Sequence, residues 1–130
     1  TLFRKGISMS GHNILQQLAR EPEMAILDPG DAGTIVVDRT LGICSIVTAG
    51  SETRKIASPA RAGIIIALCF KTDGGDVAIT GSGSEILNSG AGTETTATMA
   101  DAGDLLVLMS IEKGANIVWS PIANNGAAMS

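Results

Sequence analysis

From residue 33 onward, the sequence is a series of short apolar runs separated by turns rich in glycine, proline, serine and aspartate. The turns recur about every 8 to 12 residues, and no apolar period of 3.6 residues accompanies them. This regular spacing of the turns leaves room only for short strands. It predicts an all-β fold, namely an antiparallel β-sandwich or small barrel with a jelly-roll-like arrangement.

The last two runs predict a β-hairpin. Residues 105–111 and 116–122 have strand length and are joined by four residues that include Gly114. Trp119, the only tryptophan, lies in the second run. We expect this side chain to be buried, because a large ring at this place fastens the sheet to its core.

Seven further strands are expected before the hairpin. They cover residues 34–38, 43–48, 52–57, 63–70, 76–80, 84–88 and 93–99. Because residues 63–70 are apolar without a break, this strand is expected to be buried on both faces. The sequence Thr-Asp-Gly-Gly at 72–75 predicts a hairpin turn to the next strand. Residues 84–88 predict a short edge strand.

The first 32 residues differ in character from the rest. Ser10 can cap a short helix over residues 13–20, and Pro22 stops it. One face of this helix is apolar and consists of Ile14, Leu15 and Leu18. A helix of two turns is not stable alone, so it has to dock on its own domain or on a neighbour.

A turn signal at residues 28–31, Asp-Pro-Gly-Asp, predicts the boundary between this helical segment and the strands. The chain is therefore divided into an N-terminal arm (1–32), a β domain (33–126) and a C-terminal tail (127–130).

Charge and composition narrow the classes of function. The net charge is −4, with 9 basic against 13 acidic residues, and there is no tyrosine. A nucleic-acid surface needs basic clusters and usually aromatic rings, so this class is set aside. No apolar run reaches the roughly 18 to 20 residues of a membrane span. With 16 glycines and 2% aromatic residues the core is thin, which favours pairing with other subunits.

No residue pattern predicts catalysis, a cofactor or a metal. His12 has no neighbouring partner that would make it a base. The Gly81-x-Gly83 segment lies between strands and is interpreted as a turn, not a phosphate loop. Four carboxylates flank glycine turns and could in principle bind Ca²⁺, but turn capping is the favoured interpretation. They are Asp73, Asp76, Asp101 and Asp104.

Three motifs occur in a fixed order along the β domain. Residues 52–59 read Glu-Thr-Arg-Lys-Ile-Ala-Ser-Pro and are followed by Gly63 and an apolar strand. Residues 73–77 read Asp-Gly-Gly-Asp-Val, and residues 102–104, Ala-Gly-Asp, open the hairpin that carries Trp119. This order resembles that of the head decoration, or cement, proteins of tailed bacteriophages. The resemblance covers about residues 33–126.

The resemblance implies a structural virion protein that is not an enzyme. It would bind the outer face of an assembled capsid, with the major capsid protein as partner. The implied state is a homotrimer that is assembled in the host cytoplasm and located on the capsid exterior. Related β modules also occur in tail fibres and spikes, so a module that binds a host receptor or glycan is the alternative.

Candidate capsid contacts come from two places. Arg54, Lys55 and Arg61 form the densest basic group, and arginine pairs well with carboxylates at interfaces. The same three residues could instead be the solvated side of a strand, and both interpretations stay open. The apolar arm residues Ile14, Leu15 and Leu18 are the other candidates.

Two cysteines, Cys44 and Cys69, lie inside apolar runs. Since the expected place of assembly is a reducing cytoplasm, two small buried side chains in strands are favoured over a disulfide.

Overall fold

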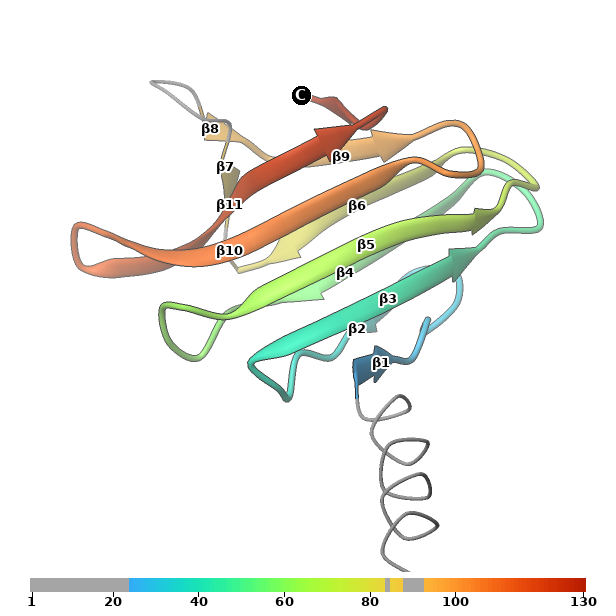
Figure 1. Cartoon of the computed structure of the whole chain (residues 1–130). Coiled ribbons are helices and arrows are strands. Elements are labelled where there is room, and N and C mark those ends of the chain that lie inside the picture. Colours follow the sequence, from blue (N-terminus) through green and yellow to red (C-terminus); the bar gives the residue numbers. More distant parts are fainter. Residues whose placement is uncertain (1–23, 84, 88–92) are drawn as a thin grey trace, which may run out of the picture.

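A computed structural model describes residues 24–83, 85–87 and 93–130. The described residues form strands that are arranged in two mixed sheets, and neither sheet closes into a barrel. The predicted all-β class is confirmed. Figure 1 shows the two sheets one in front of the other, with β3, β5 and β10 in front of β2, β4 and β6.

The larger sheet has seven strands. In spatial order they are β1 (Ala25–Ile26), β3 (Leu41–Val47), β5 (Ile65–Thr72), β10 (Leu105–Lys113), β11 (Asn116–Asn125), β7 (Ile86–Leu87) and β8 (Thr93–Glu94). The smaller sheet has five, in the order β12 (Ala128–Met129), β9 (Thr96–Met99), β6 (Val77–Ser82), β4 (Glu52–Ala57) and β2 (Gly33–Ile35).

The prediction of an antiparallel arrangement is wrong for the first half of the chain. From β1 to β6 the chain changes sheet at every connection, so that β1, β3 and β5 lie in one sheet and β2, β4 and β6 in the other. Neighbours within each of these sets are parallel. A parallel pair needs a crossover between its strands, and here a strand of the opposite sheet supplies it.

The glycine pair at 74–75 belongs to one of these crossings and not to the predicted hairpin. It connects β5 to β6, which lie in different sheets. A Cβ on Gly74 would lie 2.2 Å from the carbonyl oxygen of Thr48, and one on Gly75 would lie 2.4 Å from Gly50. The buried Thr48 hydroxyl accepts a hydrogen bond from Gly74 N and donates one to Gly75 O. Close backbone approach therefore explains the two glycines.

The predicted C-terminal hairpin is confirmed. β10 and β11 are antiparallel neighbours, with a bulge between Val107 and Leu108. Trp119 is fully buried, as expected, and its indole Nε1 donates a hydrogen bond of 2.9 Å to the carbonyl oxygen of Ala57. Because Ala57 ends β4, this bond joins the two sheets.

The core lies between the sheets. Ile46, Leu68 and Leu106 of the larger sheet pack in one cluster with Ile56 and Ile79 of the smaller sheet. These residues alternate along their strands with more exposed ones, which is the period of two that a half-buried strand requires.

Two predictions about individual strands are wrong. β5 is buried on one face only: Ile66, Leu68 and Phe70 face the core, whereas the alternate residues are partly exposed. The predicted edge strand at 84–88 contains β7, which lies between β11 and β8 and is not at the edge.

Parts of the predicted arm and tail belong to the sheets. β1 pairs with β3, and Ile26 is in the core. At the other end, β12 pairs with β9. The β domain therefore begins before residue 33 and continues past residue 126. The predicted helix over residues 13–20 lies outside the described residues.

Candidate interaction surface

Arg54, one of the predicted surface contacts, is buried inside the protein. Its residue is 1% exposed. Nε donates to Asp28 Oδ1 at 2.7 Å, and Nη1 lies 2.9 Å from Glu52 Oε1. Nη2 donates to the carbonyl oxygen of Val47 at 3.0 Å. The guanidinium group thus joins the segment before β2 to β3 and β4.

The charges of this cluster stabilise one another. Burial alone would raise the pKa of the Asp28 carboxyl, but hydrogen bonds from Arg54 and from the backbone of Val47 and Gly30 outweigh it and hold this pKa below its ordinary value. Burial would lower the pKa of Arg54, and its bonds to Asp28 and Glu52 raise it instead. Asp28 and Arg54 therefore remain ionised at neutral pH. The buried position of Arg54 gives the Glu-Thr-Arg motif a structural role here.

The other two residues of the predicted basic group point elsewhere. Lys55 follows Arg54 in β4 and is exposed, because successive side chains of a strand point to opposite faces. Arg61 is exposed in the segment before β5, where Nη2 donates to Thr40 Oγ1 at 2.6 Å. The structure therefore does not bring the three residues into one basic surface. The apolar candidates Ile14, Leu15 and Leu18 lie outside the described residues.

An extended apolar surface lies on the outer face of the seven-stranded sheet. We call it the outer apolar face and define it by three rows that the strand register places side by side. The rows are Leu41, Ile65, Met109 and Ser120; Ala25, Ile43, Ala67, Val107 and Ala123; and Ser45, Cys69, Leu105 and Asn125. None of the three rows contains a charged side chain.

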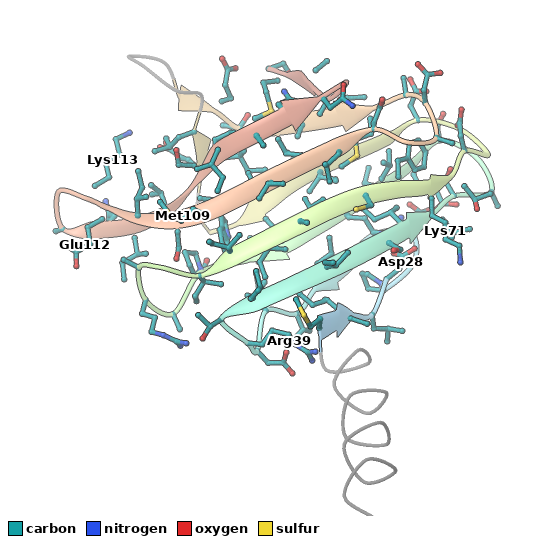
Figure 2. The ribbon with its side chains drawn as sticks, in the orientation of Figure 1. Asp28, Arg39, Lys71, Met109, Glu112 and Lys113 are labelled. Carbon is teal, nitrogen blue, oxygen red and sulfur yellow. The ribbon has the colours of Figure 1, made fainter. Side chains whose placement is uncertain are left out.

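Charged side chains stand at the ends of this face. Figure 2 shows Met109 in the middle of β10, with Lys71 and Lys113 at opposite ends of the sheet. Leu41 and Ile43 of β3 are 51% and 42% exposed. The residues that β5 and β10 contribute to the three rows are partly exposed. This face was not predicted from the sequence. The unbroken apolar run at 63–70 is the one indication of it, because alternate residues of that run belong to the face.

A hollow of about 440 Å³ adjoins the face where β1 ends. It is lined by Ala25, Ile26, Leu27, Asp28, Ile43 and Ser45. Leu27 is 85% exposed at this rim. The apolar surface therefore continues from β3 onto the segment after β1.

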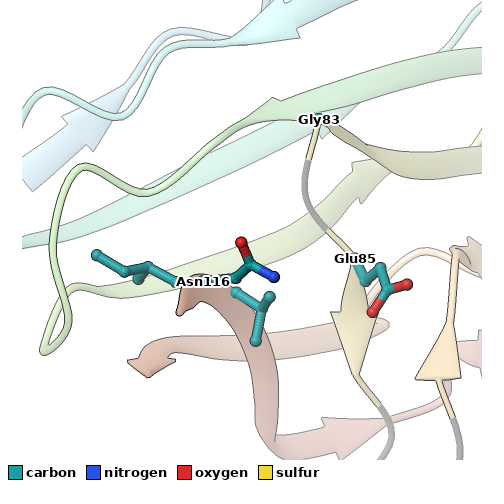
Figure 3. A pocket seen from close by; sticks show the side chains of 5 residues that line it. Gly83, Glu85 and Asn116 are labelled. Atoms are coloured by element: carbon teal, nitrogen blue, oxygen red, sulfur yellow. The ribbon is translucent and has the colours of Figure 1, made fainter. Parts of the chain in front are cut away.

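A second hollow, of about 290 Å³, lies at the far end of the same sheet (Figure 3). It is lined by Gly83, Glu85, Asn116, Ile117 and Val118. Glu85 is the only ionisable side chain among these, and it lies 3.6 Å from Lys113 Nζ. The described lining residues thus offer one carboxylate and no nucleophile beside a base.

Two of the four carboxylates beside the turns, those of Asp73 and Asp104, act as caps, as predicted. Asp73 Oδ1 accepts a hydrogen bond from Gly75 N, and Asp104 Oδ2 accepts two, from Ala100 N and Asp101 N. Within the described ranges, no three His, Cys, Asp or Glu side chains gather as metal ligands would.

The two cysteines are free thiols on opposite faces of the larger sheet. Cys44 is fully buried and faces the core, and burial raises its pKa to about 11. Cys69 lies on the outer apolar face beside Ser45, and desolvation raises its pKa as well.

The described part of the chain has no helix that is long and apolar enough to cross a membrane. Neither a known family model nor a curated protein matches this sequence.

Proposed function

We propose that the protein is a structural virion protein that decorates and stabilises a phage capsid. It would bind the outer face of the assembled shell as a homotrimer, with the major capsid protein as its partner, after assembly in the host cytoplasm. In this proposal the fold is a jelly-roll-like β-sandwich, and the chain is not an enzyme. The order of the three motifs in residues 52–119 is the sequence support.

The observation that carries the proposal is the outer apolar face. The largest apolar patch on a protein is often functional, and contiguous apolar patches rimmed by polar residues mark surfaces that meet other proteins. Here one uncharged row crosses five strands of one sheet, and an uncharged row on each side of it crosses four. A face of this kind supports a protein that works by assembly.

The alternative, a module that binds a glycan, has less support. Sugar rings stack on exposed aromatic side chains. Trp119 is fully buried and Phe70 is 1% exposed, so the described aromatic rings are in the core.

Decoration would stabilise the shell by mass action. A ligand that binds the assembled lattice and not its free subunits shifts the equilibrium toward the lattice. One oligomer that touches several capsomers adds avidity, because its second contact forms at a high effective concentration.

Co-sedimentation tests this function. Expanded heads of the phage that encodes the chain, produced without it, are mixed with the purified protein and pelleted. We expect saturable binding to heads and no binding to unassembled capsid subunits. Absence of the protein from the pellet at all concentrations would contradict the proposal. Lys55 and Arg61 remain contact candidates, and the double variant K55A/R61A should bind more weakly if they reach the shell.

A further inference from the structure

We propose that the outer apolar face of the seven-stranded sheet is the surface through which copies of this chain associate. The inference goes beyond the proposed function: a face that packs on the same face of another copy does so about a two-fold axis, so the contact joins copies in pairs and does not require the homotrimer. The contact itself is argued from the relief, charge and size of the face.

The relief of the face fits another copy of the same surface. Its middle row runs Ala25, Ile43, Ala67, Val107 and Ala123 from strand to strand. Small and branched side chains therefore alternate across the sheet, as ridges and troughs. When two such faces meet, the ridges of one copy can fill the troughs of the other, which is how sheets pack face to face.

The charge pattern also fits self-association. The three rows contain no ionisable side chain except the thiol of Cys69, and lysines stand at the ends of the sheet. Apolar centres that are depleted of charge are typical of interface cores. Contact between two such faces would bury no unpaired charge.

The outer apolar face is smaller than the area that a stable interface buries, so residues around it must also belong to the contact. Five strand widths of about 4.8 Å and three row widths of about 6.7 Å give a footprint of at most about 24 Å by 20 Å. This is about 60% of the 800 Å² that each partner of a stable interface buries. The contact must therefore include its rim, where Leu27 and Val47 are 85% and 45% exposed.

The first test is the mass of the full chain in solution, measured by sedimentation velocity from about 1 to 100 µM. We expect an oligomer that dissociates on dilution. Val107→Lys and Ile43→Lys each place a charge in the middle row, and each should raise the dissociation constant at least tenfold. Thr53→Lys is the matched control, because Thr53 is an exposed, branched residue in β4 of the smaller sheet and lies away from the face and its rim. It should associate like the unchanged chain.

The second test needs no substitution in the face. Cys69 lies in the third row and Cys44 faces the core, so the rate at which iodoacetamide alkylates Cys69 reports whether the face is covered. We expect Cys69 to react slowly in the oligomer and quickly after dilution. Cys44 is the internal reference and should react only when the protein unfolds.

Two results would overturn the inference. One is an oligomer whose mass is unchanged by both lysine variants, with Cys69 still reactive. The other is a monomer at 100 µM; if Cys69 is then protected and becomes reactive when residues 1–23 are deleted, the chain's own N-terminal segment covers the face. Neither result depends on phage heads. A chain that associates but ignores heads would contradict the proposed function alone.

Discussion

Arg54 holds three parts of the chain together through one guanidinium group. It is buried, and its partners Asp28 and Glu52 have side chains that are 16% and 14% exposed. Replacing Arg54 by methionine leaves both carboxylates largely desolvated without a cation. We expect a loss of about 3 kcal/mol in the free energy of unfolding.

Urea unfolding at pH 7 measures this loss. Lys55→Met is the matched control, because the neighbouring side chain is exposed and its removal should change the stability by less than about 0.5 kcal/mol. Equal effects of the two substitutions would show that the buried ion pairs add nothing to stability.

Asp28 predicts how this stability depends on pH. Its pKa in the folded protein is held below the ordinary value of 3.8. The stability that it contributes is therefore complete at pH values above its unfolded pKa, and it is lost as the pH falls through the lower, folded value. Asp28→Asn should be less stable than the unchanged chain at pH 6, and the difference should shrink below about pH 4. A difference that stays constant down to pH 2 would contradict this account.

Trp119 combines burial with a hydrogen bond between the sheets. Trp119→Ala removes the largest core side chain and should cost about 3 to 5 kcal/mol in the free energy of unfolding. Since it is the only tryptophan, its fluorescence is a direct check on the unchanged chain. An emission spectrum of a fully hydrated indole would be incompatible with the buried position.

At the scale of elements, the short strand β1 and the turn after it tie the N-terminal side to the core. Ile26 is in the core cluster, and Asp28 binds Arg54 and accepts a hydrogen bond from Val47 N. We expect that a chain without residues 1–23 still folds, whereas a chain without residues 1–28 loses at least about 3 kcal/mol of stability or does not fold. Circular dichroism melts of the two truncated chains measure the difference.

The relative stability of these two chains shows which N-terminal residues contribute to the fold. If both melt like the full chain, β1 and Asp28 do not contribute to the fold. If the shorter deletion already prevents folding, residues 1–23 belong to the core. In that case the arm predicted from the sequence would not be a separate segment.

How far the sequence predicts these elements depends on the range of the interactions. The hairpin of β10 and β11 follows from two adjacent runs and the turn at Gly114, all of which are local. The parallel pairing of β3 with β5 could not be predicted, because the turn residues that close a hairpin also serve a crossing between sheets. Gly74 and Gly75 illustrate this: their neighbours are residues 48–51, which are far away in the sequence.

The surface residues, too, could not be predicted where they depend on contacts between distant parts of the sequence. The sequence makes Arg54 a candidate contact, because arginine pairs well with carboxylates at interfaces. Its burial depends on Asp28, which is 26 residues away and whose partner cannot be identified from the sequence. The outer apolar face likewise depends on the register of five strands, although the unbroken apolar run at 63–70 places apolar side chains on both sides of β5.

In the whole molecule, the inner and outer faces of the sheets have different roles. Their inner faces form the core, which is closed by Trp119 and by the Arg54 cluster. In our proposal, the outer apolar face of the larger sheet joins copies of the chain. An oligomer built in this way would offer several identical surfaces to a symmetric shell, which is the arrangement that multivalent binding requires.

We propose that this oligomer stabilises an assembled shell, and the heat stability of phage heads is the test of that stabilisation. Heads produced without the chain are warmed in steps, with and without the added protein, and the released DNA is measured by the fluorescence of an intercalating dye. The account predicts release at a higher temperature when the protein is present, with a shift that grows with its concentration and then saturates. Identical release temperatures at saturating protein would contradict it.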